Sequence, residues 1–237
     1  ELANEYLTEQ GITILNDITL NSVSNDGNKP VITANGQNYT FDAVLYATGR
    51  KPNTANIGLE NTDITTNERG AIVVNDTCES SVPRVYAVGD VNGGPQFTYI
   101  SLDDFRIVFG ALTGNGQYTL KDRKNIPYTT FLTPPLARVG LTEEDAINKG
   151  YTVKTKEMLV ATMPRAHVND YLKGAFKIVV NADNDLILGA TLYSQGAEEL
   201  INLIKMAMDN NIPYTYFKNQ IFTHPTMAEN LNDLCNF

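Results

Sequence analysis

The first forty residues contain short β-prone runs separated by tight-turn sequences, and this alternation strongly constrains the fold. Residues 18–23, 31–34 and 39–41 are rich in aliphatic, β-branched and aromatic side chains. Asn-Asp-Gly-Asn at 25–28 and Asn-Gly at 35–36 lie between them, and these residue types tolerate the positive φ that hairpin turns require. The pattern predicts a small antiparallel meander.

The segments on either side of this meander have the order of elements found in an α/β domain. Residues 1–10 predict a short amphipathic helix that ends at Gly11, and residues 12–15 predict a strand. A helix that leads directly into a strand is the second half of a β-α-β unit, whose first strand is missing here. Residues 42–47 predict an apolar strand of the buried parallel type. We therefore expect the chain to be a piece of a longer protein.

The middle of the chain predicts a strand, a glycine, an acid and a helix in that order. Strands are expected at residues 72–74 and 85–88, and the second is followed directly by a glycine and an aspartate. Apolar residues recur at helical spacing over 102–112, and Asp103 and Asp104 lie near the positive N-terminus of that helix.

The remainder of the chain, from about residue 126, predicts an α+β domain with a mostly antiparallel sheet. Thr142 and Asp145 match a capping box for its first helix, and Gly150 ends that helix. Strands are expected at 128–132, 151–162, 175–180 and 186–193, with helices at 143–149 and 197–210.

Composition excludes several classes of function. The net charge of -9 over 237 residues argues against a nucleic-acid partner, because binding phosphates requires clustered Lys and Arg. Apolar stretches such as 186–192 are far shorter than the roughly 20 residues that cross a bilayer, so no membrane partner is expected. No signal-peptide pattern is present at the start, which favours the cytoplasm. Cys78 and Cys235 form no metal-ligand pattern, so no metal is expected.

Two glycines, each followed by a charged residue, lie at the ends of predicted strands. Gly49-Arg50 follows the strand at 42–47, where ligands bind in open α/β sheets, although a simple turn explains the spacing equally well. At Gly89-Asp90 the glycine permits close approach of the backbone, and the acid accepts hydrogen bonds from ligand hydroxyls or caps the following element.

The segment His224-Pro225-Thr226-Met227-Ala228-Glu229 combines a candidate acid/base with a candidate orienting carboxylate. An imidazole titrates near neutrality and can exchange a proton with a thiol, and a carboxylate can fix its tautomer. Thr226 and Glu229 also match a helix capping box, so capping alone is an alternative explanation of Glu229.

Taken in order, these motifs resemble the flavin-dependent pyridine nucleotide-disulfide oxidoreductases, which include glutathione reductase, dihydrolipoamide dehydrogenase and mercuric reductase. The resemblance implies the C-terminal half of such a flavoprotein: an α+β dimerisation domain preceded by the C-terminal pieces of the α/β NAD(P)H- and FAD-binding domains. It places the NAD(P)H-domain piece at 1–51, the FAD-domain piece at 52–120 and the dimerisation domain at 121–237. The motifs that carry it are 47–53 (ATGRKPN), 85–90 (VYAVGD), 131–135 (FLTPP) with 139–142 (VGLT), and 224–229 (HPTMAE).

The resemblance also implies roles for individual residues. Asp90 would bind the ribityl chain of FAD, with Gly89 allowing the approach, and Gly49 and Arg50 would lie near the path of the nicotinamide nucleotide. In a homodimer, His224 would act as the acid/base at the partner's thiols, oriented by Glu229. Electrons would pass from NAD(P)H to FAD, to a disulfide, and then to a small-molecule disulfide or oxidant in redox homeostasis.

The chain also departs from the family pattern. It has no G-x-G-x-x-G fingerprint and no C-x-x-x-x-C pair, so we expect the chain alone to be inactive and to retain no FAD. The segment 161–167 is closest to bacterial reductases of the reactive-chlorine response, and His167 within it is expected to be a surface or interface residue. The alternatives are a non-catalytic dimerisation or interaction domain and a flavoprotein of the single-cysteine NADH oxidase type.

Overall fold

The computed structural model describes residues 1–237, which form two compact units. The N-terminal unit comprises Glu1–Asp122 and the C-terminal unit comprises Arg123–Phe237. The predicted division into 1–51, 52–120 and 121–237 stays a prediction.

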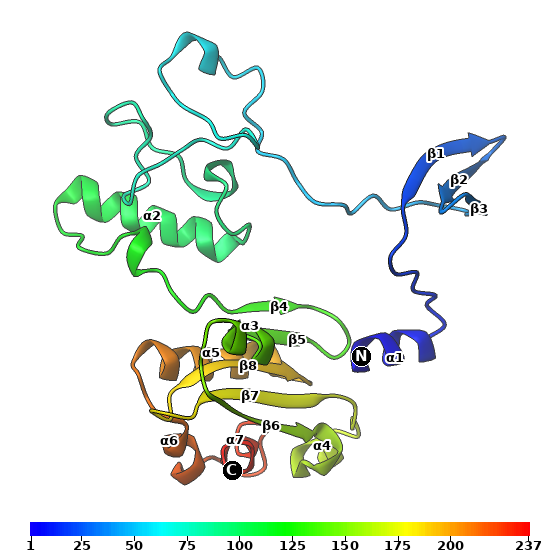
Figure 1. The fold of residues 1–237 in the computed structure, drawn as a ribbon, viewed down its shortest axis with the longest axis vertical. Coiled ribbons are helices and arrows are strands. Elements are labelled where there is room, and N and C mark those ends of the chain that lie inside the picture. Colours follow the sequence, from blue (N-terminus) through cyan, green and yellow to red (C-terminus); the bar gives the residue numbers. More distant parts are fainter. The chain divides into compact units, whose positions relative to one another are not determined.

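The N-terminal unit begins with helix α1 (Leu2–Glu9) and continues into a three-stranded antiparallel sheet (Figure 1). Its strands β1 (Leu20–Asp26), β2 (Lys29–Ala34) and β3 (Gln37–Thr40) are adjacent in sequence order. Gly27, Asn35 and Gly36 have positive φ in the two turns, as the sequence requires. The helix and the meander are therefore predicted correctly.

Other strands predicted in this unit do not form. Residues 12–15 and 42–47 have no strand structure, and Leu45 in the second segment is 90% exposed instead of buried. A buried parallel strand needs hydrogen-bonding neighbours on its edges, and no segment of this chain pairs with either run. The segments at 72–74 and 85–88 make only isolated bridges, Thr66 with Ile72 and Glu79 with Tyr86.

Helix α2 (Thr98–Thr113) follows the short 3-10 helices η1 (Leu59–Asn61) and η2 (Gly89–Asn92) and precedes η3 (Leu120–Asp122). The periodicity predicts the helix correctly but not its buried face. The buried side chains of α2 are Ile100, Asp104 and Ile107. Its most apolar stripe is exposed, and consists of Leu102, Phe105, Phe109 and Leu112.

The C-terminal unit is built on a five-stranded antiparallel sheet with the strand order β4-β5-β8-β7-β6 (Figure 1). The predicted α+β domain with an antiparallel sheet is confirmed. The strands are β4 (Tyr128–Thr130), β5 (Leu136–Gly140), β6 (Val153–Leu159), β7 (Ala175–Asn181) and β8 (Ile187–Tyr193). The helices are α3 (Glu143–Asn148), η4 (Val160–Thr162), α4 (Pro164–Val168), α5 (Ala197–Asp209), α6 (Tyr214–Asn219) and α7 (Asn230–Leu234).

The core of the C-terminal unit lies between the sheet and its helices. Helix α5 contacts β8 and β5 through a buried stripe at helical spacing, which includes Ile201 and Ile204. Helix α7 contacts β6 and β7, and its Leu231 and Leu234 are fully buried. The segment just before α7, which contains His224 and Glu229, is joined to this core through Met227 and Phe222.

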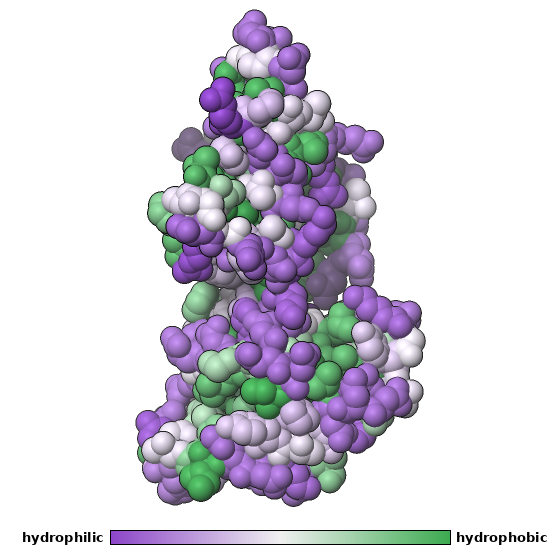
Figure 2. Space-filling view, turned by 90° about the vertical axis from the view of Figure 1, so that its left-hand side faces the viewer, coloured by the Kyte–Doolittle hydropathy of each residue, from purple (hydrophilic) through white to green (hydrophobic).

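The surface shows hydrophobic residues interspersed among hydrophilic ones on the face drawn in Figure 2. Helices of the structure are all too short or too polar to cross a membrane.

Candidate functional site

The predicted pair His224 and Glu229 is in direct contact. Nδ1 of His224 lies 2.8 Å from Oε2 of Glu229. The imidazole side chain is 70% exposed, whereas the carboxylate is only 18% exposed. A carboxylate that accepts a hydrogen bond from Nδ1–H keeps the proton on Nδ1 and leaves Nε2 of the ring as a proton acceptor. The arrangement can therefore exchange a proton with a group that approaches the exposed edge of the ring.

Glu229 also makes hydrogen bonds within the local turn, although helix α7 begins only at Asn230. The role of Glu229 as an orienting carboxylate stays a prediction. Oε1 of Glu229 accepts from the backbone N–H of Thr226 at 3.2 Å, and the N–H of Glu229 donates to Oγ1 of Thr226 at the same distance. These reciprocal bonds have the pattern of a capping box. One carboxylate oxygen fixes the turn while the other faces His224, so the turn itself orients the carboxylate.

Residues that sequence reasoning missed anchor this turn to the core. Asn230 is buried, and its Nδ2 donates to the carbonyls of Thr226 and Met227 at 3.2 and 3.1 Å. Lys156 on β6 donates from Nζ to the carbonyls of Asp233 and Asn236 at the other end of α7. These side chains reach the backbone of residues that the sequence does not mark as partners, so no sequence signal identified them.

The second predicted site lies in the N-terminal unit at the turn η2. Gly89 has φ of +72°, and a Cβ added there would lie 2.7 Å from Oγ of Ser101 on α2. Any other residue would be strained and would press on the helix, so glycine is required at this position. The backbone N–H of Gly89 donates to Oδ2 of Asp104 at 2.7 Å.

Arg50 and Asp90, which are forty positions apart, form an ion pair in the structure. Nη1 of Arg50 lies 3.1 Å from Oδ2 of Asp90. Gly49 has φ of +103°, and nothing lies within 4 Å of a Cβ added there. This glycine therefore serves the bend of the backbone and not a close contact. The two predicted cofactor motifs are brought together by this pair, a contact that the sequence did not indicate.

The remaining candidates do not form a second reactive site. Cys235 is buried, and this burial raises the pKa of its thiol to about 12, so little thiolate is present near neutral pH. Cys78 is also buried. Nε2 of His167 on α4 lies 2.8 Å from the carbonyl oxygen of Ala161 in the preceding helix η4. No group of three His, Cys, Asp or Glu side chains in residues 1–237 is arranged to hold a metal ion.

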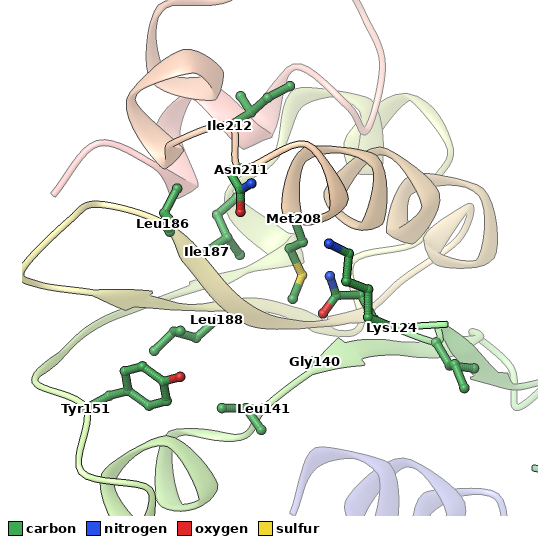
Figure 3. A pocket seen from close by; sticks show the side chains of 12 residues that line it. Lys124, Gly140, Leu141, Tyr151, Leu186, Ile187, Leu188, Met208, Asn211 and Ile212 are labelled. Atoms are coloured by element: carbon green, nitrogen blue, oxygen red, sulfur yellow. The ribbon is translucent and has the colours of Figure 1, made fainter. Parts of the chain in front are cut away.

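A pocket of about 490 Å³ lies in the C-terminal unit near the end of α5. Figure 3 shows the side chain of Met208 extending from this helix toward β8, with Leu188 and Tyr151 nearby. Its lining is mixed, with polar residues such as Lys124 and Asn211 beside aliphatic ones, and none of the predicted site residues belongs to it. The candidate chemistry is therefore separate from this pocket.

The fold and the order of the two motif regions define a class of redox protein. A family model for pyridine nucleotide-disulphide oxidoreductases matches residues 1–104, and the model for the dimerisation domain of the same enzymes matches residues 126–235. The chain belongs to the pyridine nucleotide-disulphide oxidoreductase family.

Individual relatives agree with this assignment. The chain is 44% identical over 228 residues to the probable pyridine nucleotide-disulfide oxidoreductase RclA of Escherichia coli, covering 96% of this chain and 52% of that protein. It is 36% identical to a mercuric reductase of Staphylococcus aureus, covering 98% of this chain and 43% of that protein. The solved structure of the HOCl-induced flavoprotein disulfide reductase RclA from E. coli matches with a TM-score of 0.95 at 42% identity, over 99% of this chain and 54% of that one. The chain thus spans about half the length of the relatives it matches.

Proposed function

We propose that this chain is the C-terminal half of an FAD- and NAD(P)H-dependent disulfide reductase, and that His224 is its acid/base. The observation that carries the proposal is the 2.8 Å contact between His224 Nδ1 and the largely buried carboxylate of Glu229. That contact fixes the imidazole while leaving its other nitrogen exposed. The family membership and the half-length match to the relatives support the same reading.

In the proposed reaction, His224 takes the proton of a thiol as the thiolate attacks a disulfide, and returns it to the departing thiolate. Glu229 holds the ring in one tautomer and stabilises it when it is protonated. The thiols belong to the segment that precedes this chain in the longer protein, and they are contributed by the partner subunit of a homodimer. The substrate that is finally reduced is a small-molecule disulfide or an oxidant.

The residues that would hold the cofactors lie in the N-terminal unit. Asp90 presents a partly exposed carboxylate beside a glycine turn, which fits the ribityl hydroxyls of FAD because carboxylates accept strong hydrogen bonds. Gly49 and Arg50 follow residues 42–47 and would lie near the nicotinamide nucleotide. When bound, FAD supplies the acceptor for the hydride of NAD(P)H. Because this chain provides only one side of such a site, we expect the purified 237-residue chain to be colourless.

The test replaces His224 by Gln in the longer reductase that contains this chain. Reduction of the flavin by NAD(P)H should be unchanged, whereas disulfide turnover should fall about 100-fold or more, the usual contribution of a general acid/base. The matched control is His167→Gln, which changes the only other histidine and should leave both rates unchanged. Normal turnover in His224→Gln would remove His224 from the mechanism.

Two further measurements separate the proposal from its alternatives. Light scattering should give twice the 26.1 kDa mass of the chain, and a strict monomer would contradict the proposed homodimer. Flavin absorbance without any disulfide reductase activity in the longer protein would favour a flavoprotein of the NADH oxidase type. Absence of flavin from the longer protein would favour a non-catalytic interaction domain.

A further inference from the structure

A buried carboxylate lies directly behind the proposed flavin-binding turn. Asp104, in the first half of helix α2, is 0% exposed. Its Oδ2 accepts from the backbone N–H of Gly89 at 2.7 Å and from Nδ2 of Asn92 at 2.9 Å. A polar group that is buried away from water is costly unless it is hydrogen-bonded. Asp104 is therefore tied to the turn and not to solvent.

The two donors that Asp104 binds are the first and the last residue of η2. Gly89 begins this 3-10 helix and Asn92 ends it, so one oxygen spans the whole turn. Asn92 closes the turn further, because its Nδ2 also lies 3.3 Å from the carbonyl of Ala87 and its Oδ1 accepts from the N–H of Gly94 at 3.0 Å. Asp90 lies within this turn, one residue after the N–H that Asp104 holds.

We propose that Asp104 is the positioning residue of the flavin site: it fixes the backbone of η2 so that the carboxylate of Asp90 is presented in one orientation. The inference rests on the proposed function, in which Asp90 binds the ribityl hydroxyls. Arg50 pairs with the side chain of Asp90, whereas Asp104 binds the backbone of the turn that contains Asp90. In this proposal the orientation of Asp90 is thus set from α2, through the turn that carries Asp90.

The test measures the dissociation constant of FAD in the longer reductase that contains this chain, after removal of the flavin and titration back. Asp104→Ala removes the acceptor of two hydrogen bonds and should raise the Kd of FAD about 10- to 100-fold, the change expected when two buried donors lose their partner. Asp104→Asn keeps the shape and one acceptor oxygen, so it should fold and show a smaller increase. Asp103→Asn is the matched control, because this neighbouring aspartate is only partly buried and accepts from the hydroxyl of Tyr118. It should leave the Kd unchanged.

A double-mutant cycle distinguishes positioning from a merely structural effect. If Asp104 acts through Asp90, Asp104→Asn should raise the Kd much less in an Asp90→Asn background than in the unmodified protein. Equal fold-changes in both backgrounds, or no change from Asp104→Asn and Asp104→Ala alone, would overturn the inference. An unchanged Kd for Asp90→Asn would instead overturn the flavin role of Asp90, and with it the proposed function of this turn. The two failures are therefore separable.

Discussion

The two units of this chain differ in how much of their apolar surface they bury by themselves. The connected core of the C-terminal unit runs from Ala137 to Cys235 and includes fully buried residues such as Phe176 and Leu192. In the N-terminal unit, the buried apolar residues are few and scattered, and large apolar side chains such as Phe105 and Phe109 are exposed. Burial of apolar surface is the main favourable term in folding. The C-terminal unit therefore carries most of the stability of this chain.

This difference also separates the two candidate sites. His224 and Glu229 lie on a turn that α7 and Asn230 fix to the well-packed core. Asp90 lies on a turn that Asp104 of α2 and Asn92 hold by hydrogen bonds, in a unit with little core of its own. The proposed proton-handling pair is thus held next to a well-packed core, whereas the proposed cofactor turn lies in a unit with few buried apolar side chains.

The largest expected effect comes from separating the two units. Expressed alone, Arg123–Phe237 should unfold in one cooperative transition and protect the amides of β7, β8 and α5 from hydrogen exchange. Glu1–Asp122 alone should exchange rapidly and melt without a sharp transition, because it buries too little apolar surface. Thermal denaturation and hydrogen exchange measure both. Strong protection of amides from exchange in the isolated N-terminal unit would contradict the expected difference in stability between the two units.

A matched pair of leucine substitutions tests the same difference within the intact chain. Leu192 on β8 is 0% exposed, whereas Leu102 on α2 is 49% exposed. Leu192→Ala should lower the free energy of unfolding by about 2–5 kcal/mol, because it leaves a cavity in a packed core. Leu102→Ala should change it by less than about 0.5 kcal/mol. Denaturant titrations measure both values, and comparable losses at the two positions would show that α2 is packed as tightly as the sheet.

Features of the fold that depend on neighbouring residues could be predicted from the sequence. Asn35-Gly36 specified its hairpin turn, and Thr142 with Asp145 specified the start of α3, because each signal lies within a few residues. The contact between His224 and Glu229 belongs to the same kind, since both residues lie in one short turn.

Features that depend on distant segments were predicted less well. The strand at 42–47 was predicted from its apolar composition, but a strand also needs a partner, and no other part of the chain pairs with it. The apolar stripe of α2 identified the helix but could not say which face is buried, and Asp104 on the buried face was interpreted only as a charge near the helix N-terminus. The pair of Arg50 with Asp90 spans forty positions, and no local pattern predicts such a contact.

Loss of the N-terminal cap of α3 is expected to have a smaller effect. It tests how much a local hydrogen bond adds to the stability that the core gives to the C-terminal unit. Oγ1 of Thr142 accepts from the N–H of Asp145 at 2.9 Å. Thr142→Ala removes this bond and should lower the free energy of unfolding by about 1 kcal/mol. The exposed Thr152 provides a control, since Thr152→Ala should stay within about 0.5 kcal/mol of the unmodified chain. A loss at Thr142 as large as that at Leu192 would mean that local caps, and not the core, dominate this unit.

The smallest effect is a dependence on acid that arises from two carboxylates of α3. A hydrogen bond and an ion pair with Lys177 hold the pKa of Glu143 below its ordinary value of 4.5, and hydrogen bonds from Thr142 hold the pKa of Asp145 below 3.8. Because the folded state binds these protons more weakly than the unfolded state, the two carboxylates contribute to folding stability above about pH 4.5. This contribution is lost as the pH falls through the lowered pKa values.

Glu143→Gln should therefore destabilise the C-terminal unit at pH 7 by at most about 1 kcal/mol, as expected of a surface pair. The difference in stability between this variant and the unmodified chain should shrink in acid. Denaturant titrations at pH 7 and pH 3 measure this, with Glu144→Gln on the same helix as the control. A difference that stays constant with pH would show that Glu143 acts through packing and not through its charge.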